Sequence, residues 1–150
     1  MVEYRFCPQC GQDLAGKDLV KEGFHPWCGS CDIVFFQPVP LRLIALIQED
    51  GGSVLLQEDG HFPLFPVRYG EWLEDAFHRG FSAIFGGEPL FCEYVNSFWE
   101  ERDGALLVAM KAPFSLSNAI YSTPPLSRWF PPKDLPDTLT ETERRLLDFL

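Results

Sequence analysis

Four cysteines form two closely spaced pairs near the start of the chain. Each pair has two residues between its members, and 17 residues separate the two pairs. Two such knuckles supply the four soft ligands that a tetrahedral zinc ion prefers. With four protein ligands the site is closed to substrate, so the spacing predicts a zinc ion that supports the fold and does no chemistry. The predicted ligands are Cys7, Cys10, Cys28 and Cys31.

Two other residues, His25 and Cys92, carry side chains that could take part in chemistry, and Gly11 affects the shape of the first knuckle. Gly11 follows the first pair, where a tight knuckle turn commonly needs a positive φ. His25 could replace one ligand, but packing beside the knuckle is the more common role of such a histidine. Cys92 stands in an apolar segment, which favours a buried inert thiol over a nucleophile. Disulfides or a redox pair remain the alternatives to zinc, and both fit an intracellular protein less well.

Charge and composition exclude several classes of protein. The chain has 150 residues, with 22 acidic and 12 basic side chains and a net charge of −10. A nucleic-acid binder needs a basic face, so we expect no nucleic-acid partner. We find no membrane-spanning stretch and no secretion signal in the sequence, and therefore expect a cytoplasmic protein without membrane contact. The apolar fraction of 46% predicts a globular fold.

The pattern of apolar residues, prolines and glycines predicts two parts. A small zinc ribbon is expected at residues 1–38 and a mixed α+β domain at residues 39–150, because two prolines interrupt the chain at the boundary. Gly86 would end the first helix, and Thr140 with Glu143 would form a capping box on the second. The predicted strands are 41–48, 54–57, 90–100 and 105–112, the helices 71–85 and 140–150, and the irregular segments 61–69 and 113–136.

The order of several motifs resembles the Nudix hydrolases of the NADH-pyrophosphatase type, in which a zinc ribbon precedes the catalytic domain. The resemblance implies a Nudix-like α/β/α sandwich and extends over most of the chain. Each match outside the ribbon is weak alone, and their order gives them weight. They are Val34 to Pro38, Phe62, Pro63, Val67, Gly70, Glu71, Ala76, Arg79, Phe81, Gly86, Arg128, Trp129, Phe130, Leu135 and Pro136.

The departures from the family pattern concern its metal ligands. With Glu71, Arg79 and Gly86 as anchors, the three glutamates that hold magnesium or manganese in the family fall on Gly80, Ala83 and Ile84. None of these residues offers a side-chain oxygen to a hard cation. Two glycines of the family's loop become Leu64 and Phe65, and residues 115–127 contain no acid that could act as a base. The resemblance therefore implies a pseudoenzyme without catalytic residues.

Two functions stay open at this point. The first is a non-catalytic module that binds a small molecule or a protein partner, with a homodimer as a possible form. The second is a divergent Nudix pyrophosphohydrolase acting on a nucleoside-diphosphate-linked substrate, with magnesium or manganese at relocated ligands. An acidic stripe on the predicted helix favours this second function only weakly, because such a stripe is more often a solvated face. The relocated ligands would be Glu71, Glu74, Asp75, His78 or Glu88.

Overall fold

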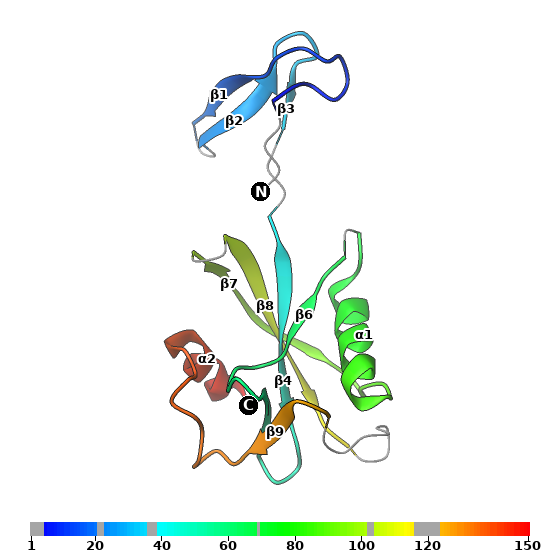
Figure 1. Ribbon diagram of the computed structural model, residues 1–150, viewed down its shortest axis with the longest axis vertical. Coiled ribbons are helices and arrows are strands. Elements are labelled where there is room, and N and C mark those ends of the chain that lie inside the picture. Colours follow the sequence, from blue (N-terminus) through cyan, green and yellow to red (C-terminus); the bar gives the residue numbers. More distant parts are fainter. Residues whose placement is uncertain (1–4, 21–22, 36–38, 69, 102–103, 116–123) are drawn as a thin grey trace. The chain divides into compact units, whose positions relative to one another are not determined.

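The computed structural model describes residues 5–20, 23–35, 39–68, 70–101, 104–115 and 124–150 (Figure 1). The chain divides into two compact units, Met1–Val39 and Pro40–Leu150. In these described ranges, no helix combines the length and the apolar character that crossing a membrane would need.

A three-stranded antiparallel sheet forms the first unit, with β2 in its centre. The first cysteine knuckle precedes β1, and the second begins with Cys28, the last residue of β2. Among the described residues of this unit, Cys7 and Cys28 are the only buried apolar side chains. The unit therefore has almost no apolar core of its own. Its strands are β1 (Ala15–Leu19), β2 (Gly23–Cys28) and β3 (Ile33–Val34).

A six-stranded mixed sheet forms the centre of the second unit. Its order is β7-β8-β4-β5-β9, and β6 pairs with the first half of β4. β4 and β8 run parallel along the whole of β4, whereas the other pairs are antiparallel. The strands are β4 (Leu41–Gln48), β5 (Val54–Gln57), β6 (Leu64–Pro66), β7 (Glu93–Glu100), β8 (Ala105–Pro113) and β9 (Ser127–Phe130).

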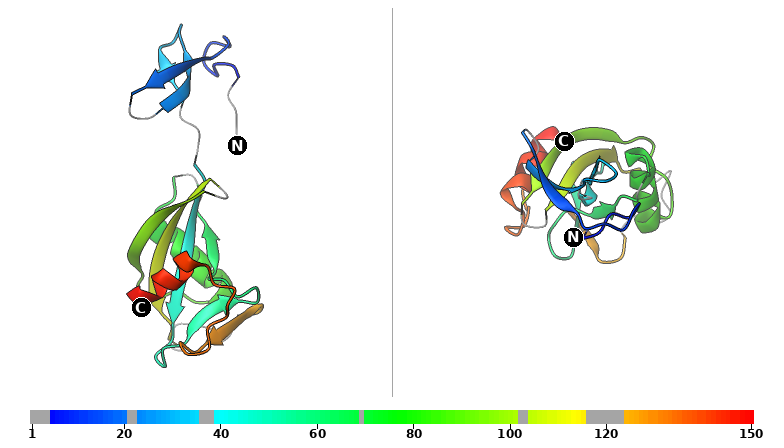
Figure 2. Two further views of the ribbon diagram at one scale, coloured as in Figure 1. Left: turned by 90° about the vertical axis from the view of Figure 1, so that its left-hand side faces the viewer. Right: turned by 90° about the horizontal axis from the view of Figure 1, so that it is seen from above.

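Helices cover both faces of this sheet (Figures 1 and 2). Helix α1 (Leu73–Phe85) packs on the face to which Leu43 and Ile47 of β4 point. Helix α2 (Glu141–Leu146), which continues into a 3₁₀ turn (Leu147–Phe149), packs on the face of Ile44 and Leu46. Alternate side chains of one strand thus enter different cores, as expected for a strand buried on both sides. The predicted α/β/α sandwich is confirmed.

Aromatic rings fill much of the core beneath α1. Phe77, Phe81 and Phe85 lie along the inner side of the helix, and the rings of Phe81 and Phe85 have centroids 4.5 Å apart. The row continues from the helix through Phe114 to Trp129 of β9. These contacts join the helix to the residue after β8 and to the edge strand β9, and they hold α1 firmly in place.

Two short strands occur where irregular segments were predicted. β6 lies inside 61–69 and pairs with β4 from Ile44↔Leu64 to Arg42↔Pro66, and β9 lies inside 113–136 and pairs with β5. Both predictions of irregular structure were wrong for these residues. Prolines stand in or beside each strand and lack the N–H that a longer ladder needs, so neither segment shows a recognisable strand pattern.

The carboxylate of Glu143 fastens the loop before β6 to α2. It accepts hydrogen bonds from the Thr140 N–H in the predicted capping box and from the Phe62 N–H. It also lies 3.0 Å from Nδ1 of His61. This contact, with a smaller effect from Asp59, raises the pKa of His61 above its ordinary value of 6.5. Protonated His61 and ionised Glu143 therefore attract each other.

The His61–Glu143 contact should make stability depend on pH. Because the folded-state pKa of His61 is raised, its contribution is fully present below pH 6.5 and is lost as the pH rises through the folded-state pKa. We expect His61→Gln to lower the urea midpoint more at pH 5.5 than at pH 9. His78→Gln, on α1, serves as the control and should show no such difference. Equal effects of His61→Gln at both pH values would contradict the assignment.

Candidate functional site

The four predicted cysteines come together in the first unit. Their Sγ atoms all lie within 4.8 Å of one another, and those of Cys10 and Cys28 are 3.5 Å apart. A tetrahedral ion with bonds of about 2.3 Å to sulfur would hold the sulfurs about 3.8 Å apart. The cluster therefore suits a zinc ion with little rearrangement. Cys7 and Cys28 are buried, whereas Cys10 is exposed.

The residue after each knuckle has the left-handed backbone that closes the turn. Gly11 has φ of 77°, as predicted, and its N–H donates to the Cys7 carbonyl oxygen. Asp32 has φ of 52° at the matching place after the second knuckle, and its carboxylate accepts a hydrogen bond from Nε1 of Trp27. Aspartate tolerates this conformation better than most side chains. The second turn thus works without a glycine.

The other two candidates for thiol or metal chemistry lie apart from this cluster. His25 is in β2, and the ligand cluster found among the described residues consists of cysteines alone. Cys92 precedes β7, is half-buried and packs against the core beneath α1. Burial raises the pKa of its thiol, and Glu74 adds to the effect. Both observations agree with a structural role for Cys92 rather than a nucleophilic one.

The space above Gly80 is filled by an aromatic ring. Phe65 of β6 is 5% exposed and lies directly against Gly80 of α1. A Cβ placed on Gly80 would overlap the Phe65 ring, at distances that real side chains do not reach. The resemblance noted from the sequence places a loop glycine of the family at Phe65 and a metal-binding glutamate at Gly80. The ring therefore occupies the place where a longer side chain at position 80 would have to pass.

The remaining positions of the helix face are apolar but less enclosed. Ile84 is half-buried and packs against the core, whereas Ala83 is exposed. The buried residues of α1 are Ala76, Phe77, Gly80, Phe81 and Phe85. Ala83 lies instead at the border of a cavity.

A cavity of about 410 Å³ lies beside α1, β6 and the start of β9, and we call it the α1–β6 cavity. Apolar residues form most of its wall, and two arginines lie on its border. No Asp or Glu belongs to its described lining. The lining residues are Gln57, Pro63, Leu64, Phe65, Pro66, Arg68, Arg79, Gly80, Ala83, Ile84 and Ser127.

A second cavity, of about 400 Å³, lies on the other face of the sheet, between β4, β7 and the start of α2. We call it the α2-side cavity. It is more polar and contains charged groups of both signs, among them Arg42, Glu100 and the His61–Glu143 pair. Gln57 and Leu64 belong to the linings of both cavities, so the two are neighbours.

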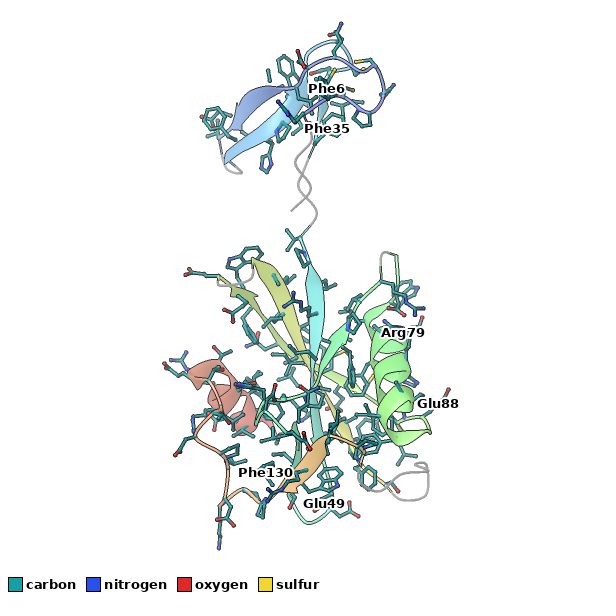
Figure 3. The ribbon with its side chains drawn as sticks, in the orientation of Figure 1. Phe6, Phe35, Glu49, Arg79, Glu88 and Phe130 are labelled. Atoms are coloured by element: carbon teal, nitrogen blue, oxygen red, sulfur yellow. The ribbon has the colours of Figure 1, made fainter. Side chains whose placement is uncertain are left out.

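Glu71, which precedes α1, forms an ion pair with Arg79 in the middle of the helix; Figure 3 labels Arg79. Nε and Nη2 of Arg79 donate to the two carboxylate oxygens at 3.0 and 2.8 Å, and Nη2 also donates to the Pro66 carbonyl oxygen. The Arg68 N–H donates to the same carboxylate. The pKa of Glu71 is lowered to about 2, mainly by the hydrogen bonds from Arg79 and to a smaller extent by the hydrogen bond from the Arg68 N–H. The pair joins the loop after β6 to the helix.

The Glu71–Arg79 pair should contribute stability that acid removes. Because the folded-state pKa of Glu71 is depressed, its contribution is present above the ordinary value of 4.5 and is lost as the pH falls towards 2. We expect Glu71→Gln to lower the thermal midpoint clearly at pH 7, and the difference from wild type to shrink by pH 3. The exposed Glu58 offers the control Glu58→Gln. A difference that stays constant with pH would contradict this role.

The relocated metal site considered from the sequence gains no support from the geometry. In the described ranges, the four cysteines are the only group of three or more potential ligands close enough to share an ion. Glu71 is bound to Arg79, Glu74 and Asp75 are exposed, and Glu88 follows the C-terminal end of α1 (Figure 3). Their carboxylates do not converge with His78.

Sequence reasoning missed the polar residues of the α1–β6 cavity. Gln57 lies in β5, Arg68 lies in the loop that follows β6, and Ser127 lies in β9. No local pattern connects positions so far apart, and the pairing of β5 with β9, which brings Ser127 opposite Gln57, was not predicted. The wrongly predicted irregular segment was thus the reason for the miss.

Comparisons with known proteins identify the fold. No family model and no curated protein matches the sequence. Among solved structures, a Nudix hydrolase from Nitrosomonas europaea superposes with a TM-score of 0.60 and 15% identity, over 96% of this chain and 88% of that one. The Nudix domain of Shewanella oneidensis NrtR, in complex with ADP ribose, gives 0.54 and 16%, over 81% and 90%.

A third similar structure is bound to a protein. The C-terminal domain of mouse MUTYH, in complex with human PCNA, superposes with a TM-score of 0.53 and 16% identity, over 74% of this chain and 86% of that one. At these identities the likeness establishes the fold and leaves the activity open.

Proposed function

We propose that this protein with the Nudix fold binds a small organic ligand without hydrolysing it. The observation that carries the proposal is the contact between Phe65 and Gly80. An aromatic ring fills the space into which a metal-binding carboxylate at position 80 would project. The substitution is therefore built into the packing of the domain, and the helix face supports binding better than catalysis.

The chemistry of the helix face also argues against hydrolysis. Magnesium and manganese bind through oxygen ligands, which Gly80, Ala83 and Ile84 do not offer. Without such an ion, nothing at this face would neutralise the charge that develops on a diphosphate or activate a water molecule. The described residues thus do not fit the metal of the Nudix hydrolases, and we derive no catalytic step for this chain.

Two cavities provide room for a ligand. Each has about 400 Å³, which is within the range of small-molecule sites. Gln57 and Leu64 belong to the linings of both, so these two residues can influence a ligand in either cavity. The complex of the Nudix domain of NrtR with ADP ribose supports the idea that a domain of this fold can serve as a binding module.

The four cysteines would hold a structural zinc ion. The arrangement of Cys7, Cys10, Cys28 and Cys31 fits tetrahedral coordination and leaves no open position for substrate. Zinc bound there would stabilise the ribbon and take no part in the chemistry of the second unit.

A hydrolysis screen tests the proposed function. Zinc-loaded protein is incubated with NADH, ADP-ribose, nucleoside triphosphates and diadenosine polyphosphates, each with magnesium and then with manganese. A known Nudix hydrolase serves as the positive control. We expect no turnover by this protein.

Metal-dependent turnover that survives repurification would overturn the proposal and favour the divergent pyrophosphohydrolase. In that case Glu74→Gln and His78→Gln would show whether the acidic stripe of α1 supplies the metal ligands.

Binding of a protein partner is the second candidate function. It is favoured by the outer strand β7, on which the side chains of Tyr94 and Trp99 are more than half exposed. The complex of the MUTYH domain with PCNA is an example of protein binding by a similar fold. Trp99→Ala should weaken capture of such a partner and leave ligand binding at the cavities unchanged.

A further inference from the structure

The α1–β6 cavity has a charge opposite to that of the whole chain. The protein contains 22 acidic and 12 basic residues, yet two arginines and no acid belong to the described lining of this cavity. Arg79 is paired with Glu71, so the charge that a divalent cation would meet is mainly the guanidinium group of Arg68, which lies near Glu71 without forming an ion pair with it and disfavours metal binding there. An anion would meet attractive charge without any metal ion.

Arg68 is available to bind such an anion. Its side chain is exposed and makes no hydrogen bond or ion pair among the described residues. Arg79 differs, because its Nε and Nη2 are held by Glu71 and Pro66. An arginine can bind a carboxylate through two parallel hydrogen bonds, which gives both strength and orientation.

Two neutral donors lie in the same lining. Gln57 and Ser127 face each other in the register of β5 and β9, and no hydrogen bond of either side chain is present in the described ranges. The amide of Gln57 and the hydroxyl of Ser127 can both donate to an oxygen anion. Together with Arg68 they offer donors from three separate segments of the chain.

The floor of the cavity suits an apolar group. The Phe65 ring, the backbone of Gly80 and the side chains of Ala83 and Ile84 form it, and Pro63 and Pro66 extend the wall. A diphosphate carries more charged oxygens than Arg68, Gln57 and Ser127 can satisfy, and the remaining oxygens would lose their hydration against these apolar surfaces. An aromatic or branched aliphatic group would bury its apolar surface there instead.

We propose that the α1–β6 cavity binds an organic carboxylate with an apolar body, directly on Arg68 and without a divalent cation. This inference rests on the proposed function and names the class of its ligand. The carboxylate lies at the Arg68 side of the cavity, and the apolar body lies on Phe65, Ala83 and Ile84. A volume of about 410 Å³ admits a fused aromatic ring system.

Titration of ¹⁵N-labelled, zinc-loaded protein with 2-naphthoate tests this inference by NMR. We expect saturable shifts of the backbone amide signals of Gly80, Ala83 and Ile84. The affinity for naphthoate should be the same in buffer with magnesium and in buffer without it, and neither buffer contains a chelator that would remove zinc. The methyl ester of naphthoate should bind at least about tenfold more weakly, because it lacks the charge that strengthens the hydrogen bonds from Arg68.

Substitutions test separately whether Arg68 binds the carboxylate and whether the apolar part of the cavity holds the ring system. Arg68→Gln should weaken naphthoate binding by about tenfold or more, and Arg68→Lys should retain part of it. Lys133→Gln removes the same charge from an exposed loop outside the lining and should leave the affinity unchanged. Ala83→Trp fills the cavity from an exposed position and should abolish binding, while the spectrum of the rest of the domain reports that the fold is intact.

The possible results separate this inference from the proposed function. Absence of saturable binding up to millimolar naphthoate, or equal binding to wild type and Arg68→Gln, would overturn the inference and leave the absence of hydrolysis untouched. Binding that requires magnesium would also overturn it. Hydrolysis in the substrate screen would overturn the proposed function whether or not naphthoate binds.

Discussion

Replacing Gly80 with alanine is expected to destabilise the second unit by about 1–3 kcal/mol or more, the usual cost of adding atoms to a filled core. Intrinsic helix propensity predicts the opposite sign, because alanine is favoured over glycine inside a helix by roughly 0.5–1 kcal/mol. We expect the destabilising effect to be the larger of the two, because the new methyl group would overlap the Phe65 ring. Urea unfolding measures the difference, and Ser82→Ala on the same helix is the control.

A double-mutant cycle tests whether Phe65 is the cause. Phe65→Ala alone should destabilise the domain by about 3–5 kcal/mol, because it removes a buried ring. In the Phe65→Ala background, Gly80→Ala should cost little or become stabilising. Additive effects of the two substitutions would contradict the contact.

Glutamates at positions 80, 83 and 84 together should not restore hydrolysis while Phe65 remains. The ring blocks the path of the glutamate at position 80.

Removal of zinc is expected to unfold the first unit and leave the second folded. Among the described residues of the first unit, only Cys7 and Cys28 are buried apolar side chains, so packing alone cannot offset the loss of chain entropy. Structural zinc in comparable small sites binds with about 10–16 kcal/mol at neutral pH. Cys28→Ser, or a strong chelator, should therefore collapse the dispersion of the first unit's NMR signals, including the Trp27 indole.

The signals of the second unit provide the internal control for this experiment. The indole of Trp129, which packs against Phe85 and Phe114, should keep its position. Cys92→Ser removes the cysteine outside the cluster and should leave the first unit folded. A first unit that keeps its dispersed signals without metal would contradict the structural role of zinc.

Short sequence patterns were sufficient to predict those features that depend on residues close together in the sequence. The cysteine spacing predicted the cluster, and Thr140 with Glu143 predicted the cap of α2. Gly86 was expected to end α1, and it does so with φ of 72°. In each case the residues that make the contact are within a few positions of one another or follow a known spacing.

Contacts between distant segments could not be predicted in this way. Phe65 and Gly80 stood out in the sequence as departures from the pattern of the family that it resembles, but their contact depends on the pairing of β6 with β4, which the flanking prolines concealed. Arg68 and Ser127 likewise meet at one cavity only because β9 pairs with β5. Three- and four-residue strands carry too little alternation to be recognised.

The contact between Phe65 and Gly80 also constrains how these two positions can change over generations. A larger residue at position 80 is tolerated only after the ring at position 65 has gone, and loss of the ring first leaves a void in the core. Both orders pass through a destabilised intermediate. The two positions therefore form an epistatic pair, and packing against this phenylalanine opposes any larger side chain at position 80.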